Sequence, residues 1–134
     1  MNDNDATDPG LIMPTDIAAP AAAYAHARLT SEAGTWLHTS GVVPIAPDGS
    51  VPPSIEAQAD VVWTNLGAML RDAGMEAHHV VSITTYVTPG HDLSGVMARR
   101  DEALGGHLAA STLVVVPELA RPEWRVEIAL VAAR

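Results

Sequence analysis

The chain has 134 residues, 48% of them hydrophobic, and a formal net charge of −9 from 16 acidic and 7 basic residues. This length and hydrophobic content predict one globular domain with a real core. The negative charge argues against a nucleic-acid partner and against an anionic membrane surface, because Lys and Arg supply most of the affinity for both. The chain contains no Cys, which excludes disulfides, thiolate metal sites and cysteine nucleophiles.

The N-terminal residues carry no structural pattern. Residues 1–10 are acidic and lack hydrophobic periodicity, so we predict a mobile tail there. No signal peptide is visible, and no apolar run approaches the roughly 20 residues of a membrane-spanning helix. We therefore expect a cytoplasmic protein with no membrane association, in which residues 11–134 form a single domain.

The first half of the domain predicts two strands and a helix. Short extended stretches are expected within 29–45, on either side of a turn at 31–34, and the second of them is a strand over 35–40. A loop rich in Pro and Gly follows. Ser54 is a good N-cap for a helix with apolar side chains at helical spacing, and Gly74 is a natural stop.

The second half predicts a strand, a helix and two more strands. Residues 80–88 alternate and are rich in β-branched side chains, which is typical of a strand. Asp92 is expected to cap a helix that runs to about Leu104, and strands are expected over 112–116 and 124–131. This order predicts an α+β fold in which a mainly antiparallel sheet carries two helices on one face.

The other face of this sheet also needs a cover. Residues 113–116 and 126–131 are largely apolar on both strand faces, unlike strands that have one wet side. The chain offers no third helix, so we expect an oligomer in which sheets of different subunits pack together. Phe is absent, which leaves Trp36, Trp63 and Trp124 as the large core side chains.

Glu127 lies alone in the most apolar stretch of the chain, residues 124–133. An ionised carboxylate is unfavourable to bury unless it is paired or hydrogen-bonded, so this residue is a candidate for chemistry. Two alternatives remain: a Glu at a solvated edge, or one paired with an Arg of its own chain. Arg125 would share a strand face with Glu127 and is a candidate partner.

The order and spacing of several segments within 18–133 resemble the RidA/YjgF family of small trimeric proteins. The segments that carry the resemblance are Ala19-Pro20, Tyr24 to Ala27, Thr39 to Pro44, Ile55 to Ala59 with Asn65-Leu66, Ala73-Gly74, Val80-Val81, Thr84 to Val87, Ser111-Thr112 and Val126-Glu127-Ile128.

The resemblance implies a chorismate-mutase-like α+β fold and a homotrimer whose sheets form a central barrel. It also implies three clefts between subunits, in which small-molecule enamines or imines such as 2-aminoacrylate are hydrolysed to a 2-oxo acid and ammonia. Carried over residue by residue, Glu127 would be the catalytic acid and base. Ser40, Gly41 and Tyr24 would shape the pocket, together with residues 110–112, which are Ala110, Ser111 and Thr112. No metal or other cofactor is expected.

One position departs from the family pattern. The enamine and imine deaminases have an Arg directly before the Ser-Thr or Ser-Cys pair, where it binds the substrate carboxylate, and this chain has Ala110. Alanine cannot replace a planar guanidinium. Arg125 and Arg121 are candidate replacement cations, although each is also read as a solvent-facing or interface residue. His107 lies near the vacated position and is a further candidate, with a loop histidine as the alternative.

The resemblance thus leaves two hypotheses open. The first is an enzyme, leaning towards an enamine or imine hydrolase that deaminates or isomerises a small metabolite. The second is a non-catalytic trimer that binds a ligand or acts like a chaperone. A ribonuclease role fits poorly with the charge of −9.

The remaining charged and histidine residues predict no further site. Residues 99–102, Arg-Arg-Asp-Glu, are expected to form a solvated helix face. His78 and His79 are adjacent and point apart on a helix or a strand, so they would chelate a metal poorly. Ser40 has no recognisable His and Asp partners for nucleophilic catalysis.

Overall fold

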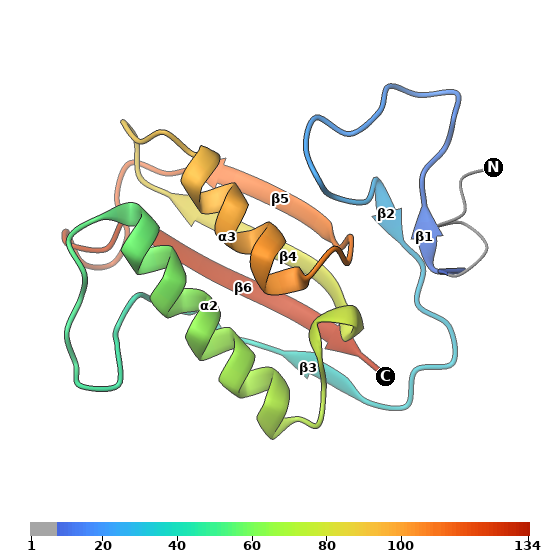
Figure 1. The fold of residues 1–134 in the computed structure, drawn as a ribbon, viewed down its shortest axis with the longest axis horizontal. Helices are drawn as coiled ribbons and strands as arrows, with labels where there is room; N and C mark the ends of the chain where they lie inside the picture. Colours follow the sequence, from blue (N-terminus) through green and yellow to red (C-terminus); the bar gives the residue numbers. More distant parts are fainter. Residues whose placement is uncertain (1–7) are drawn as a thin grey trace.

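The computed structural model describes residues 8–134, so the tail expected over residues 1–10 lies mostly outside the described residues. Of that stretch, Asp8 is described, and it forms an ion pair with Arg28 in which Oδ2 lies 2.6 Å from Nη1. The elements, drawn in Figure 1, are β1 (Leu11–Ile12), β2 (Ala27–Arg28), β3 (Trp36–His38), α2 (Ile55–Asp72), the short 3-10 helix η1 (Ala77–His79), β4 (Val80–Val87), α3 (Ser94–Leu104), β5 (Ala110–Val115) and β6 (Val126–Ala133).

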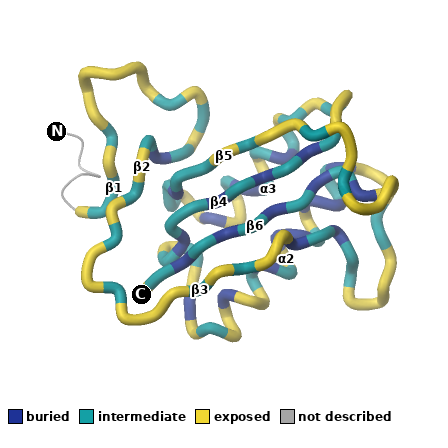
Figure 2. The backbone as a smooth tube through the Cα atoms, turned by 180° about the vertical axis from the view of Figure 1, so that it is seen from behind, coloured by how far each residue is buried: buried dark blue, intermediate teal, exposed yellow. Residues whose placement is uncertain are grey.

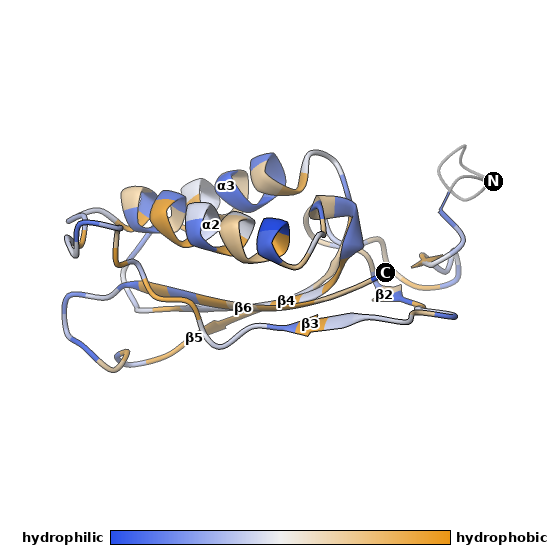
Figure 3. Ribbon diagram, turned by 90° about the horizontal axis from the view of Figure 1, so that it is seen from below, coloured by the Kyte–Doolittle hydropathy of each residue, from blue (hydrophilic) through white to orange (hydrophobic). Residues whose placement is uncertain are grey.

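The main sheet has the strand order β3-β6-β4-β5. The pairs β3–β6 and β4–β6 are antiparallel, whereas β5 runs parallel to β4, because α3 carries the chain back across the sheet between them. Both helices lie on one face of this sheet (Figure 3), and β1 and β2 pair separately. The predicted α+β architecture, mainly antiparallel with two helices on one face, is therefore confirmed.

The helix boundaries follow from local chemistry. The Ser54 hydroxyl accepts the Ala57 N–H at 3.2 Å at the start of α2, and Gly74, just beyond the helix, has φ +67°. Asp92 Oδ1 accepts the Ser94 N–H at 3.0 Å and so helps to begin α3. Both helices were expected from their capping residues and their periodicity.

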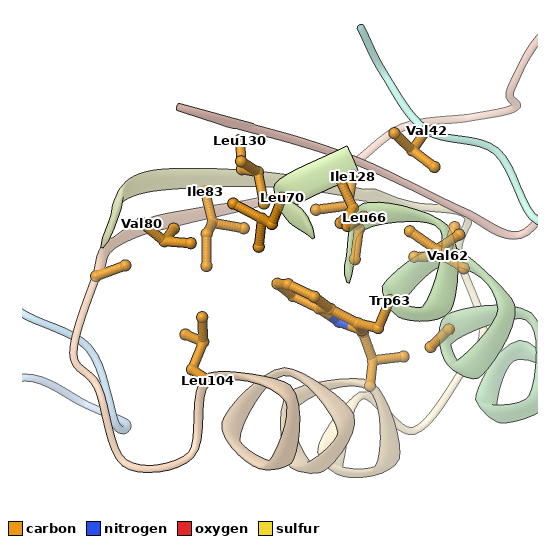
Figure 4. Packing of buried hydrophobic residues seen from close by; sticks show 14 of the residues in the cluster. Val42, Val62, Trp63, Leu66, Leu70, Val80, Ile83, Leu104, Ile128 and Leu130 are labelled. Carbon is orange, nitrogen blue, oxygen red and sulfur yellow. The ribbon is translucent and has the colours of Figure 1, made fainter. Parts of the chain in front are cut away.

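The core lies between the helices and the sheet. Alternate residues of β6 point into it, namely Val126, Ile128, Leu130 and Ala132, and each is at most 2% exposed. Figure 4 shows the ring of Trp63, from α2, between α3 and the sheet. Trp63 and Trp124 are both 8% exposed, as expected for large core fillers.

Trp36 is not a core residue, and this prediction was wrong. It is 48% exposed. The strand β3 lies at the edge of the sheet, and alternation along it turns Leu37 towards the core and Trp36 towards the opposite face. The Trp36 ring stacks on His38 there, with centroids 6.3 Å apart.

Several predicted strand boundaries also differ from the structure. The expected strand 124–131 begins at Val126 and runs to Ala133, and the expected strand 35–40 is only Trp36–His38. Residues 29–30 form no strand; instead β2 ends at Arg28 and pairs with β1. Strands of two or three residues are too short to produce a sequence pattern.

The face of the sheet opposite the helices has no cover among residues 8–134, and we call it the bare face (Figures 2 and 3). Alternation and register place on it Trp36, His38, Thr84, Tyr86, Ala110, Thr112, Val114, Glu127, Ala129, Val131 and Ala133. Val114 is 39% exposed. The bare face is thus mostly apolar, apart from one carboxylate. In the described part of the chain, neither helix has the length and hydrophobicity needed to cross a membrane.

Gln58 fastens the loop before β6 to α2. Its side chain is fully buried. Nε2 donates to the carbonyl oxygens of Pro52 and Glu123, each at 2.8 Å, and Oε1 accepts the Arg125 N–H at 2.8 Å. All the polar atoms of the amide are therefore used, and they fix the point at which β6 enters the sheet.

Replacing Gln58 with Met keeps the approximate volume and removes these three hydrogen bonds. We expect the free energy of unfolding to fall by about 3 kcal/mol, because buried backbone groups lose their partners. Thr64→Ala, on the exposed side of the same helix, is the control and should change it by less than about 0.5 kcal/mol. Urea denaturation measures both, and equal stability of the two variants would contradict this role of Gln58.

Candidate active site

Glu127 lies on an interior strand but outside the core. It stands in β6, between Val126 and Ile128, which both point towards the helices, so its own side chain lies on the bare face and is half-buried. Its register partner on β4 is Tyr86. Within residues 8–134 Glu127 forms no salt bridge, so neither alternative reading, a sheet-edge position or an ion pair within the chain, describes it.

Gly41 packs directly against the Glu127 carboxyl group. Val42 pairs with Ile128 through two backbone hydrogen bonds of 2.7 and 3.1 Å, and this pairing brings the preceding residue alongside Glu127. A Cβ atom on Gly41 would lie 2.9 Å from Glu127 Oε1 and 2.8 Å from Cδ. The position therefore requires glycine if the carboxyl group is to keep its place.

Ser40 continues this cluster towards α2. It is exposed and lines a groove of about 660 Å³ together with Gly41 and residues of α2, among them Asn65 and Met69. The lining is mostly apolar, and the Asn65 amide is fixed by donation to the Ile45 carbonyl oxygen at 3.0 Å. Ser40 and Gly41 thus border both Glu127 and a groove large enough for a small molecule.

Tyr24 and Ser111 lie elsewhere. They line a cavity of about 350 Å³ together with Arg100 and Met97 of α3, on the helix-covered side of β5. Alternation along β5 turns Ala110 and Thr112 towards the bare face instead. The expected site residues therefore form two groups in one chain, on opposite faces of the sheet.

The candidate replacement cations have other contacts. Arg125 precedes β6, and its Nε lies 3.4 Å from the Pro53 carbonyl oxygen. The guanidinium of Arg121 lies 5.2 Å from the centroid of the Trp124 ring. His107 Nε2 is 2.7 Å from the Val80 carbonyl oxygen.

Arg100 was expected on a solvated helix face, and that prediction was wrong. The residue is only 6% exposed. Its Nε and Nη2 lie 3.0 and 2.9 Å from Asp101 Oδ1, and its Nη1 lies 3.4 Å from Ser111 Oγ. The sequence did contain a signal: Val96, Arg100 and Leu104 are spaced four residues apart, which puts Arg100 in the apolar row of α3.

The adjacent histidines form a local cap. The ring centroids of His78 and His79 are 4.0 Å apart, and His79 Nδ1 accepts the Glu76 N–H at 2.9 Å. Partial burial, reinforced by the neighbouring His78, lowers the pKa of His79 and favours its neutral form. Residues 8–134 contain no group of three His, Asp or Glu side chains placed to hold a metal ion.

Comparisons with known proteins point in one direction. The family model described as Endoribonuclease L-PSP matches residues 15–134. The 2-iminobutanoate/2-iminopropanoate deaminase of Escherichia coli strain K12 is 30% identical over 104 residues, which cover 75% of this chain and 81% of that protein.

Solved structures agree with this match. A Yersinia pestis protein of the conserved Rid family, YyfB, described as of unknown function, has a TM-score of 0.84 and 29% identity, covering 92% of this chain and 97% of its own. The yjgF gene product of E. coli has a TM-score of 0.69 and 26% identity, covering 92% and 98%.

The contact between Gly41 and Glu127 can be tested directly. In Gly41→Ala the new methyl group should displace the Glu127 carboxyl group, and the free energy of unfolding should change by less than about 1 kcal/mol, because the end of a flexible side chain can move. Crystal structures and thermal unfolding give both quantities. Gly34→Ala, where a Cβ meets nothing within 4 Å, is the control. An unmoved carboxyl group would contradict the expectation.

Proposed function

The chain belongs to the RidA/YjgF family, whose model carries the description Endoribonuclease L-PSP, and we propose that it hydrolyses or isomerises a small enamine- or imine-type compound, with Glu127 as acid and base. Similarity to the E. coli deaminase supports an imine deaminase-like role at the level of the family. The observation that carries the proposal is the Glu127 carboxyl group, free of ion pairs within the described residues and set against Gly41. The net charge of −9 argues against RNA as the substrate.

The chemistry needs one group that can give and take a proton. The Glu127 carboxyl group would protonate the imine nitrogen, or the enamine carbon, to give an iminium ion. Water would then add to the iminium carbon while the carboxylate takes up a proton. Breakage of the C–N bond of the resulting carbinolamine would release ammonia and leave a carbonyl compound. Ser40 and Gly41 would orient the substrate and the water.

We further propose that the active site is completed between subunits of a homotrimer. In one chain Glu127 and Gly41 lie on the bare face, while Tyr24 and Ser111 lie on the helix-covered side of the edge strand β5. Packing of bare faces would bury Trp36 and the neighbouring apolar side chains. It would also let the edge of one subunit approach Glu127 of another.

The catalytic proposal predicts a large loss in one variant. Ammonia release from enamines generated in situ should fall by about 10²–10⁴-fold in kcat/KM for Glu127→Gln, because the amide cannot transfer the proton. Glu32→Gln, at an exposed turn, is the matched control and should keep wild-type activity. If wild type and Glu127→Gln are indistinguishable on every substrate, the non-catalytic, ligand-binding alternative replaces this proposal.

Ala110→Arg tests the altered position separately. The new guanidinium should raise the rate on 2-aminoacrylate, because it restores a planar clamp for a carboxylate. The measurement is kcat/KM on 2-aminoacrylate, compared with Ala110→Gln, which adds length without charge. An equal effect of both variants would show that charge at this position does not govern the reaction.

The assembly is tested by sedimentation equilibrium. We expect a particle of three times the chain mass of 14.0 kDa. Val114→Glu places a charge on the bare face and should shift the protein towards monomer, whereas Ile17→Glu, at an exposed position outside the sheet, should not. A wild-type monomer would contradict the packing of bare faces.

A further inference from the structure

The 350 Å³ cavity between α3 and β5 contains a buried cation that the proposed reaction does not use. Arg100 extends from the inner face of α3 and shares the cavity with Tyr24 and Ser111. Its side chain is only 8% exposed. A buried guanidinium is unfavourable unless its N–H groups find acceptors, so the partners of each polar group around this cavity are informative.

The ion pair with Asp101 satisfies Arg100 only in part. One carboxylate oxygen of Asp101 faces both Nε and Nη2, at 3.0 and 2.9 Å. Nη2 is nevertheless not aligned for a hydrogen bond within the described residues. Nη1 has Ser111 Oγ at 3.4 Å, a long contact. The outer nitrogens of the guanidinium thus keep N–H groups without a good acceptor.

Two hydroxyl groups beside Arg100 also have protons to donate. Tyr24 Oη accepts the Ala21 N–H at 3.2 Å, and Ser111 Oγ accepts from Arg100. Across residues 8–134, neither hydroxyl donates to a protein acceptor. The cavity is therefore bordered by three groups that can all donate a hydrogen bond.

We propose that this cavity binds the carboxylate group of a small organic acid, through Arg100, Tyr24 and Ser111. An ionised carboxylate accepts hydrogen bonds and donates none, and it matches the planar geometry of a guanidinium. The flanking Met97 and Leu113 suit a short apolar group on the acid. Arg100, which comes from a different element than position 110, then supplies the cation that Ala110 does not.

This inference rests on the proposed function in one respect: the acid would be the enamine or imine substrate itself. The substrate would carry its carboxylate to the α3 side of one subunit and its C–N group to Glu127 of the next. The binding of an unreactive acid does not depend on that step, so the two proposals can be tested apart.

Isothermal titration calorimetry with propanoate, and with propanamide as the uncharged analogue, tests the site on the full chain. Wild type should bind propanoate and not propanamide. Arg100→Gln should weaken propanoate binding at least tenfold, as expected for the loss of a charge-assisted hydrogen bond. Arg99→Gln, which removes the same charge one residue away at a partly exposed position, is the matched control and should bind like wild type.

Tyr24→Phe and Ser111→Ala keep the test decisive if Arg100→Gln fails to fold. Each removes a single hydroxyl proton, and each should weaken propanoate binding severalfold while thermal unfolding remains close to wild type. Equal affinity for propanoate and propanamide, or unchanged affinity in the folded variants, would overturn the anion site. Loss of ammonia release in Glu127→Gln, with or without propanoate binding, bears on the proposed reaction alone.

Discussion

The two-residue alternation of β6 is the constraint on which the candidate site depends. The strand occupies an interior position in the sheet, so its side chains must go either into the core under the helices or onto the bare face. Val126 and Ile128 fill the core, which leaves Glu127 on the other side. A shift of one residue in register would bury the carboxylate and expose the apolar row. The hydrogen bonds of Gln58 to the loop before β6 help to prevent that shift.

The same alternation divides the expected site between two faces. Glu127 and Gly41 belong to the bare face, while Tyr24 and Ser111 belong to the helix-covered side of an edge strand. No rearrangement of side chains can bring groups on opposite faces of one sheet together. A site that uses both groups therefore needs a second copy of the chain. The apolar bare face supplies a physical reason for copies to associate.

Much of the fold could be predicted from the sequence because its main elements are long and well marked. The helix α2 has a Ser cap, an apolar stripe and a terminal Gly, and β4 is an eight-residue β-branched strand. By contrast, β1 and β2 have two residues each, and no periodicity can be read from such a length. Trp36 was misplaced because hydrophobicity alone does not say which face of an edge strand will be covered.

The candidate site was predictable only where neighbouring residues in the sequence determine it. The resemblance identified Glu127 and Gly41, and their contact depends on strand pairing between Val42 and Ile128, which no local pattern reveals. Arg100 was misread because its charged neighbours suggested a solvated face. Its position in the row of Val96 and Leu104 was the better guide. Helical spacing determines burial more directly than local charge density does.

Arg100 also shows why burial of a charge points to a ligand. A leucine at this position would continue the apolar row of α3 and avoid the desolvation of a guanidinium, which an ion pair often fails to offset. Asp101 is the next residue along the helix, so it meets Arg100 with a single oxygen and leaves the outer nitrogens without good acceptors. Stability alone therefore gives no account of this arginine. A carboxylate in the cavity would complete its hydrogen bonds, together with those of Tyr24 and Ser111, and would explain how a chain with Ala110 can still hold an acidic substrate.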